Sequence, residues 1–124
     1  MGSRRQAREC ALQALYMCDS LDDWSSLTIE MFFKNFHPDF ILENGEEKVK
    51  NSSFAHVLVE GVIENLTSVD RFIGMASQNW TVSRMSRVDR NILRVAAFEI
   101  CFLPDVPPNV SINEAIEVAK RFGA

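Results

Sequence analysis

Three arginines gather at the start of the chain, and their spacing puts them on one side of a helix. Arg4, Arg5 and Arg8 stand against the single acid Glu9, so residues 1–18 carry a local charge of +2, three minus one. At about 100° per residue these side chains share one arc. Guanidinium groups arranged in this way can hold phosphates of a nucleic acid. A solvated helix end explains the spacing equally well.

Tyr16 lies two helical turns beyond Arg8 and on nearly the same side. Its ring could stack on an unpaired base, as aromatic rings do in proteins that bind single-stranded nucleic acids. A half-buried tyrosine is the alternative, and spacing alone does not decide between the two.

A second group of arginines interrupts the most apolar part of the chain. Arg87, Arg90 and Arg94 fall at i, i+3 and i+7 and form one polar stripe. They could extend a basic track, but 16 of the 17 acids lie outside the first predicted helix, all except Glu9. Pairing with acids is therefore the favoured interpretation.

Glu99 is the one carboxylate inside this apolar run. A buried carboxylate can be a tuned acid or base, but no second catalytic group is apparent nearby. We therefore expect Glu99 to accept hydrogen bonds or to pair with an arginine.

Motifs of enzymes and metal sites are missing from the sequence. There is no phosphate-binding glycine loop, no nucleophile elbow and no His-Glu-x-x-His, and His37 and His56 have no partner at metal-ligand spacing. The sequence thus predicts no catalytic residue, no metal and no cofactor. The net charge of −4 does not indicate a nucleic-acid binder either. Only the basic residues at the start of the chain, set against an acidic remainder, indicate nucleic-acid binding.

Cysteine usage and hydropathy indicate the compartment. The three cysteines, Cys10, Cys18 and Cys101, are odd in number and form no Cys-x-x-Cys, which favours reduced thiols in the cytoplasm. No signal peptide and no uncharged run of membrane-spanning length is present, so we expect no membrane association.

The elements that must position these residues all read as helices. The apolar spacing predicts an all-α fold, with two small helical bundles, about residues 3–66 and 67–124, packed into one domain. The first three expected helices run from Ser3 to about Cys18, from Leu27 to Phe36, and from a cap at Ser52 or Ser53 to Leu66. The next three run from a cap at Thr67 to Ala76, from a cap at Ser86 to Leu103, and from a capping box at Ser111 to Phe122.

The helix after Ser86 is apolar almost all round, which is typical of a helix inside a bundle. Pro104 ends it. Gly61 interrupts the apolar stripe of another helix and suggests a close approach of two helices, because glycine otherwise costs about 1 kcal/mol there. Residues 35–51 are expected to form an exposed connection, and Trp80 is expected to lie in the core.

Three segments, in order along the chain, resemble the NusB family of bacterial transcription antitermination factors. Residues 4–16 (RRQARECALQALY) look like its first helix, and residues 88–99 (VDRNILRVAAFE) look like its central helix. Asp105-Val106-Pro107 and residues 111–124 (SINEAIEVAKRFGA) match the segment that follows.

The resemblance implies a non-enzymatic RNA-binding adaptor. The family binds boxA-type single-stranded RNA of ribosomal transcripts together with NusE, a small-subunit ribosomal protein, in an RNA polymerase antitermination complex. By position, Arg4, Arg5 and Arg8 match the arginines that contact RNA. Tyr16 matches a tyrosine near RNA and partner, and Asp89 matches an acidic position near the surface that binds NusE.

Two alternatives to the adaptor remain open. The same helical fold occurs as the N-terminal RNA-binding part of an RNA cytosine methyltransferase family. The family also continues past the Phe-Gly-Ala segment into a last helix, whereas this sequence stops at Ala124. We therefore expect some exposed apolar surface, through which a protein-only module would form a homodimer.

Overall fold

A computed structural model describes residues 3–36, 46–78 and 81–123, with the backbone alone for residues 3, 36 and 46–53. These residues form helices and no strand, which confirms the predicted all-α fold. The helices are α1 (Ser3–Leu21), α2 (Ser26–Phe36), α3 (Glu46–Glu64), α4 (Leu66–Ala76), the 3₁₀ turn η2 (Val82–Arg84), α5 (Arg87–Phe102) and α6 (Pro108–Phe122).

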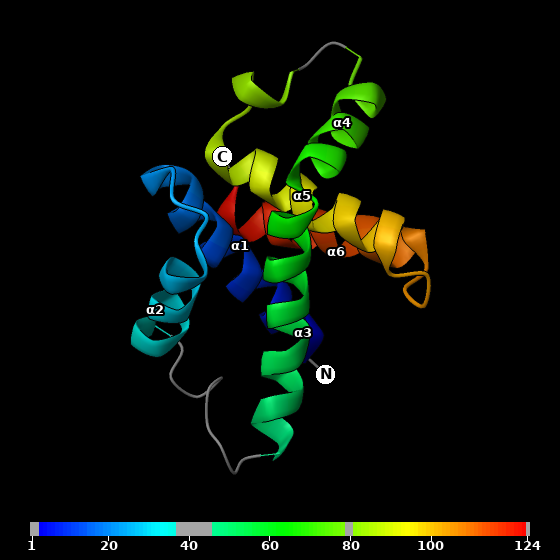
Figure 1. Cartoon of the computed structure of the whole chain (residues 1–124). Coiled ribbons are helices and arrows are strands. Elements are labelled where there is room, and N and C mark those ends of the chain that lie inside the picture. The colour runs from blue at the N-terminus through cyan, green and yellow to red at the C-terminus, as the bar shows by residue number, and fades with distance from the viewer. Residues whose placement is uncertain (1–2, 37–45, 79–80, 124) are drawn as a thin grey trace.

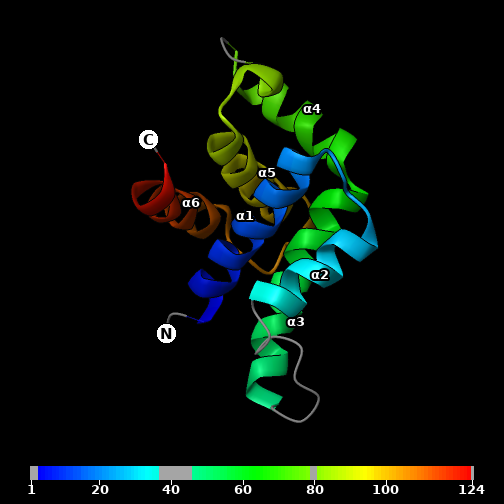
Figure 2. The ribbon, with the colours of Figure 1, turned by 90° about the vertical axis from the view of Figure 1, so that its left-hand side faces the viewer.

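Helix α1 lies in the middle of the molecule, with α2 and α3 on one side and α5 and α6 on the other (Figures 1 and 2). Its apolar stripe of Ala7, Cys10, Ala14 and Leu15 enters the main core, which α2, α3, α4 and α5 complete. Leu12 instead joins Ile92 and Val118 in a smaller core with α5 and α6. Helix α1 therefore contacts helices on both sides of the expected boundary at residue 66, and the division into two bundles stays a prediction.

Helix α5 has the predicted limits. The Ser86 hydroxyl accepts a hydrogen bond from the backbone N–H of Asp89 at 3.0 Å, and the helix ends at Phe102, two residues before Pro104. Most of its residues between Asn91 and Glu99 are buried. The prediction of a central helix enclosed by others is confirmed.

Cys10 and Cys18 are buried on α1, whereas Cys101 is exposed. Burial raises the pKa of the Cys10 thiol to about 12, and burial together with the charges of Asp23 and Asp19 raises that of Cys18 to about 11. Both side chains thus act as small apolar groups, as their positions on the predicted helix face indicated.

Three helix starts differ from the predictions. Helix α3 begins at Glu46, not at a Ser52 or Ser53 cap, because glutamate and lysine after residue 45 favour helix. Helix α4 begins at Leu66, with Asn65 at the cap position; the Asn65 side chain makes no capping hydrogen bond and instead donates to the Gly61 carbonyl oxygen at 2.9 Å.

The third difference is at α6, which begins at Pro108 rather than after a Ser111 cap. Proline suits the first helical position, where its missing N–H costs nothing. Ser111 therefore lies about one turn and Glu114 nearly two turns inside the helix, where their side chains can contact other helices. Of the connection predicted at residues 35–51, residues 46–51 instead belong to α3, whereas residues 37–45 lie outside the described residues, as does Trp80.

Gly61 marks the close approach of α3 to α5 that the sequence predicted. A Cβ atom added at Gly61 would overlap the ring of Phe98, whereas one added at Gly74 on α4 would have nothing within 4 Å. The two helices can approach this closely only because residue 61 has no side chain.

This contrast gives a prediction for two alanine substitutions. Gly61→Ala should destabilise the protein by about 1–3 kcal/mol, because Phe98 must move from its packed position. Gly74→Ala should stabilise it by about 0.4–1 kcal/mol by reducing the entropy of the unfolded chain. Urea unfolding measures both, and equal effects at the two positions would contradict the packing described.

Candidate functional site

The start of α1 presents Arg4 and Arg5 to solvent, as the sequence predicted. The Arg4 guanidinium lies over the ring of Phe54 on α3, 4.1 Å from its centroid, an arrangement that favours a cation. Among the acids whose side chains the structure describes, none lies within ion-pair distance of Arg4.

Arg5 forms a two-pronged ion pair with Glu114 of α6. Its Nε and Nη2 donate to the two carboxylate oxygens at 2.9 and 2.8 Å. The hydrogen bond and positive charge of Arg5 hold the pKa of Glu114 below its usual range, and the same pair raises the pKa of Arg5. Both groups are thus charged at neutral pH. The sequence did not reveal this pair, since Glu114 was assigned to a capping box.

Arg8 is buried, with 6% of its surface exposed, and does not share the exposed arc predicted for it. Its Nε and Nη2 donate to the carboxylate of Glu99 on α5 at 2.7 and 2.8 Å, and the Ser111 hydroxyl donates to the same carboxylate at 2.8 Å. The interpretation of Glu99 as the partner of an arginine is confirmed. Arg8 falls on the side of α1 that faces α5, where burial leaves no room for a direct phosphate contact.

The arginines of α5 pair with acids, as favoured from the sequence. Arg90 donates to both carboxylate oxygens of Asp19 at 2.6 and 2.7 Å, and Arg94 to those of Asp70 at 2.8 and 2.9 Å. Burial alone would raise the pKa of Asp19, but hydrogen bonds from Arg90 and Asn91 outweigh it and hold the pKa below its usual value. These arginines tie α5 to α1 and α4 and do not extend the basic surface.

Tyr16 and Asp89 are both exposed, Tyr16 to 42%. Asp19, one turn after Tyr16 on α1, pairs with Arg90, the neighbour of Asp89 on α5. Residues three apart share a helix face. The ion pair therefore places Tyr16 near the start of α5, whereas Asp89, about 100° around the helix from Arg90, lines the surface between α4, α5 and α6.

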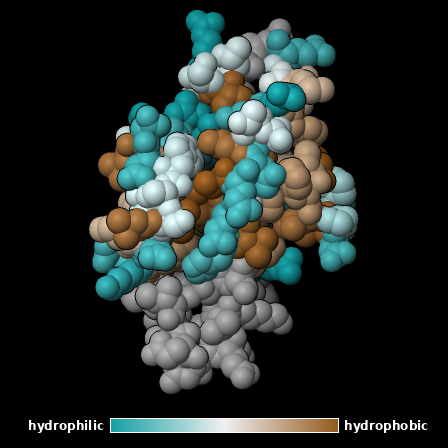
Figure 3. Space-filling view, in the orientation of Figure 1, coloured by the Kyte–Doolittle hydropathy of each residue, from teal (hydrophilic) through white to brown (hydrophobic). Residues whose placement is uncertain are grey.

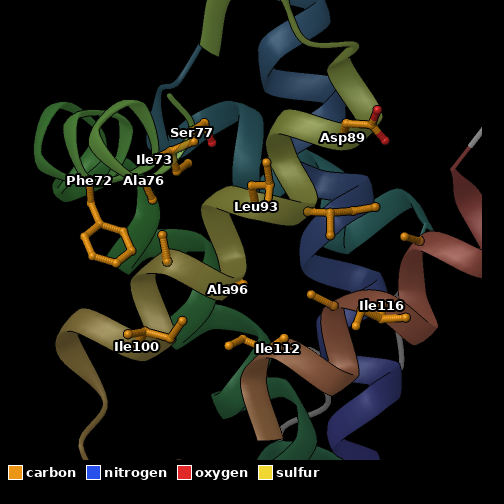
Figure 4. A pocket seen from close by; sticks show the side chains of 14 residues that line it. Phe72, Ile73, Ala76, Ser77, Asp89, Leu93, Ala96, Ile100, Ile112 and Ile116 are labelled. Carbon is orange, nitrogen blue, oxygen red and sulfur yellow. The ribbon is translucent and has the colours of Figure 1, made fainter. Parts of the chain in front are cut away.

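Asp89 also lies at the end of an apolar groove of about 370 Å³ between α4, α5 and α6 (Figure 4). Phe72 and Ile73 line one side, Leu93 and Ile100 the floor, and Ile112 and Ile116 the other side. Hydrophobic residues also reach the surface among hydrophilic ones on the face in Figure 3. The groove corresponds to the exposed apolar surface expected from the sequence.

The described residues form an all-α domain held by arginine–carboxylate pairs, and they contain no cluster of three metal-binding side chains. Within those residues, no helix combines the length and apolar character needed to cross a membrane.

The sequence model of the NusB family matches residues 5–124. The chain is 46% identical to the transcription antitermination protein NusB of Geotalea daltonii and 47% identical to that of Geotalea uraniireducens, covering all of this chain and 85% of each relative. A Thermotoga maritima NusB structure superposes with a TM-score of 0.80 at 32% identity, over 98% of this chain and 79% of that one.

A chain in a structure described as a plectonemic RNA supercoil superposes with a TM-score of 0.77 at 21% identity, over 98% of this chain and 83% of that one. This likeness concerns the fold alone. The chain belongs to the NusB family. The named members are transcription antitermination proteins, so the chain is a non-enzymatic factor, and the methyltransferase alternative is not retained.

The buried ion pair gives a prediction for stability. Glu99→Ala should lower the free energy of unfolding by about 3–5 kcal/mol, because it leaves the buried Arg8 charge with only the longer contact to Glu114, at 3.6 Å. Glu117→Ala, which removes the exposed pair with Lys120 at 3.3 Å, should change it by less than about 1 kcal/mol. Urea unfolding compares them, and a Glu99 effect as small as that of Glu117 would contradict the assignment.

Proposed function

We propose that this chain is an RNA-binding transcription antitermination factor that takes single-stranded boxA-like RNA at the start of α1. The observation that carries the proposal is the exposure of Arg4 and Arg5 on adjacent positions of the helix that resembles the family's RNA-contacting helix. Membership of the NusB family supports the antitermination role.

Each predicted RNA-binding residue has a distinct part in this proposal. Arg4 and Arg5 contact phosphates directly, and the exposed ring of Tyr16 stacks on a base further along α1. Arg8 acts indirectly, because its buried pair with Glu99 fixes the orientation of α1. A phosphate contact of Arg8 itself would require the buried pair to break.

NusE is the proposed protein partner, in an antitermination complex on RNA polymerase. Asp89 and Tyr16 supply an acidic and an aromatic contact near the start of α5. Bound there, NusE would lie next to RNA that follows α1 beyond the arginines, so RNA and NusE should strengthen each other's binding.

The RNA site is tested by changing Arg4 and Arg5 together to alanine. Affinity for a labelled boxA-like RNA should fall about tenfold or more, with helix content unchanged. The slope of log affinity against log salt should fall by about 1.4, about 0.7 for each lost phosphate contact. Fluorescence anisotropy at two salt concentrations, with and without NusE, measures both quantities.

The matched control is Arg71→Ala with Arg84→Ala, which removes two exposed arginines from α4 and η2 and causes the same change in net charge. This variant should bind RNA nearly as well as the unmodified protein. Equal losses in the two double variants would mean that net charge, and not the start of α1, determines binding.

The apolar groove favours a second candidate, a protein-only module that forms a homodimer. Two copies that bury Ile112 and Ile116 against each other should sediment as a dimer at low micromolar concentration, and Ile116→Glu should restore the monomer. Sedimentation of the unmodified chain as a monomer alone would rule this candidate out.

A further inference from the structure

Glu114 occupies the Nε–Nη2 edge of Arg5, one of the two edges through which a guanidinium can hold a phosphate by two hydrogen bonds. Arginine binds phosphate and carboxylate in the same way, through two parallel N–H groups of its planar guanidinium. Both Nε and Nη2 of Arg5 already donate to Glu114, at 2.9 and 2.8 Å. In the free protein this carboxylate therefore fills one of the two edges at which an RNA phosphate could bind Arg5, and its negative charge lies next to the other.

The ion pair between Arg5 and Glu114 lies where a ligand can separate its two members. Arg5 is 47% exposed and the side chain of Glu114 20%, so a ligand can reach both. The neighbouring pair of Arg8 and Glu99 differs, because both of its members are buried and Ser111 holds the carboxylate as well. Of these two pairs, only the one at Arg5 can exchange its anion without opening the core.

A second cation, Arg8, also lies close to Glu114. Nη1 of Arg8 lies 3.6 Å from its Oε1. When Arg5 turns to a phosphate, the carboxylate keeps this positive neighbour, and its charge is not left unpaired. The cost of opening the exposed pair is therefore small.

We propose that Glu114 is an internal competitor for RNA: its carboxylate holds one phosphate-binding edge of Arg5 in the free protein, and an RNA phosphate displaces it. This inference rests on the proposed function and adds a regulation of that site. Ligands that offer a phosphate at Arg5 replace Glu114, whereas weakly binding anions do not. Arg4 has no ion pair with an acid whose side chain the structure describes, so this competition concerns Arg5.

The test is Glu114→Gln, which keeps the size of the side chain and removes its charge. Anisotropy with the labelled boxA-like RNA should show binding about threefold to fivefold tighter than that of the unmodified protein. Glu117→Gln makes the same charge change one turn further along α6 and should alter affinity by less than about twofold.

The gain must also depend on Arg5. In a protein that already carries Arg5→Ala, adding Glu114→Gln should leave affinity unchanged, since the contested edge is gone. If Glu114→Gln instead binds RNA equally well or more weakly while the unmodified protein binds, the competition is wrong, and Glu114 holds Arg5 in its binding position.

A probe other than RNA separates this inference from the function on which it rests. Inorganic pyrophosphate, followed by the NMR signal of the Arg5 Nε–H, should act at lower concentration on Glu114→Gln than on the unmodified protein. If that holds while RNA binds neither protein, the proposed RNA-binding function fails, whereas the competition between Glu114 and a phosphate anion for Arg5 stands. If neither pyrophosphate nor RNA reaches Arg5 in either protein, both fail.

Discussion

The buried ion pair between Arg8 and Glu99 is the constraint on which the rest of this structure depends. It joins the first helix to the central one, and the Ser111 hydroxyl adds α6 to the same carboxylate. A buried charge must be matched within hydrogen-bonding distance, since water cannot solvate it. The pair therefore permits one rotation of α1, and that rotation decides which arginines face solvent.

The same logic recurs at the other end of α1. Asp19 accepts hydrogen bonds from Arg90, Asn91 and Arg94, and Arg94 continues to Asp70 on α4. With one charged cluster near each end, α1 is fixed in direction as well as rotation. Apolar packing stabilises the contacts between the helices but determines their relative orientation less strictly. The exposed surface that we propose for RNA is thus positioned by polar groups that RNA does not touch.

The sequence predicted the helices well because their signals are local. The Ser86 cap, the stop at Pro104 and the close approach at Gly61 depend on residues within one turn or on a missing side chain. It did not reveal that Arg8 is buried, unlike Arg4 and Arg5, because three arginines on one arc look alike until the position of Glu99 is known. That partner lies 91 residues away in sequence. The roles of Ser111 and Glu114 were missed for a related reason, since a capping box and a tertiary contact use the same residue types.

The long separation of Arg8 and Glu99 has a consequence for synthesis on the ribosome. Helix α1 leaves the exit tunnel first among these helices, but its charge partner is translated 91 residues later. At about 5–20 residues per second, that interval is about 5–20 seconds. Until Glu99 has been made, Arg8 has no carboxylate on α5 to accept its hydrogen bonds. The packing of α5 against α1 is then the step that separates Arg8 from the exposed Arg4 and Arg5.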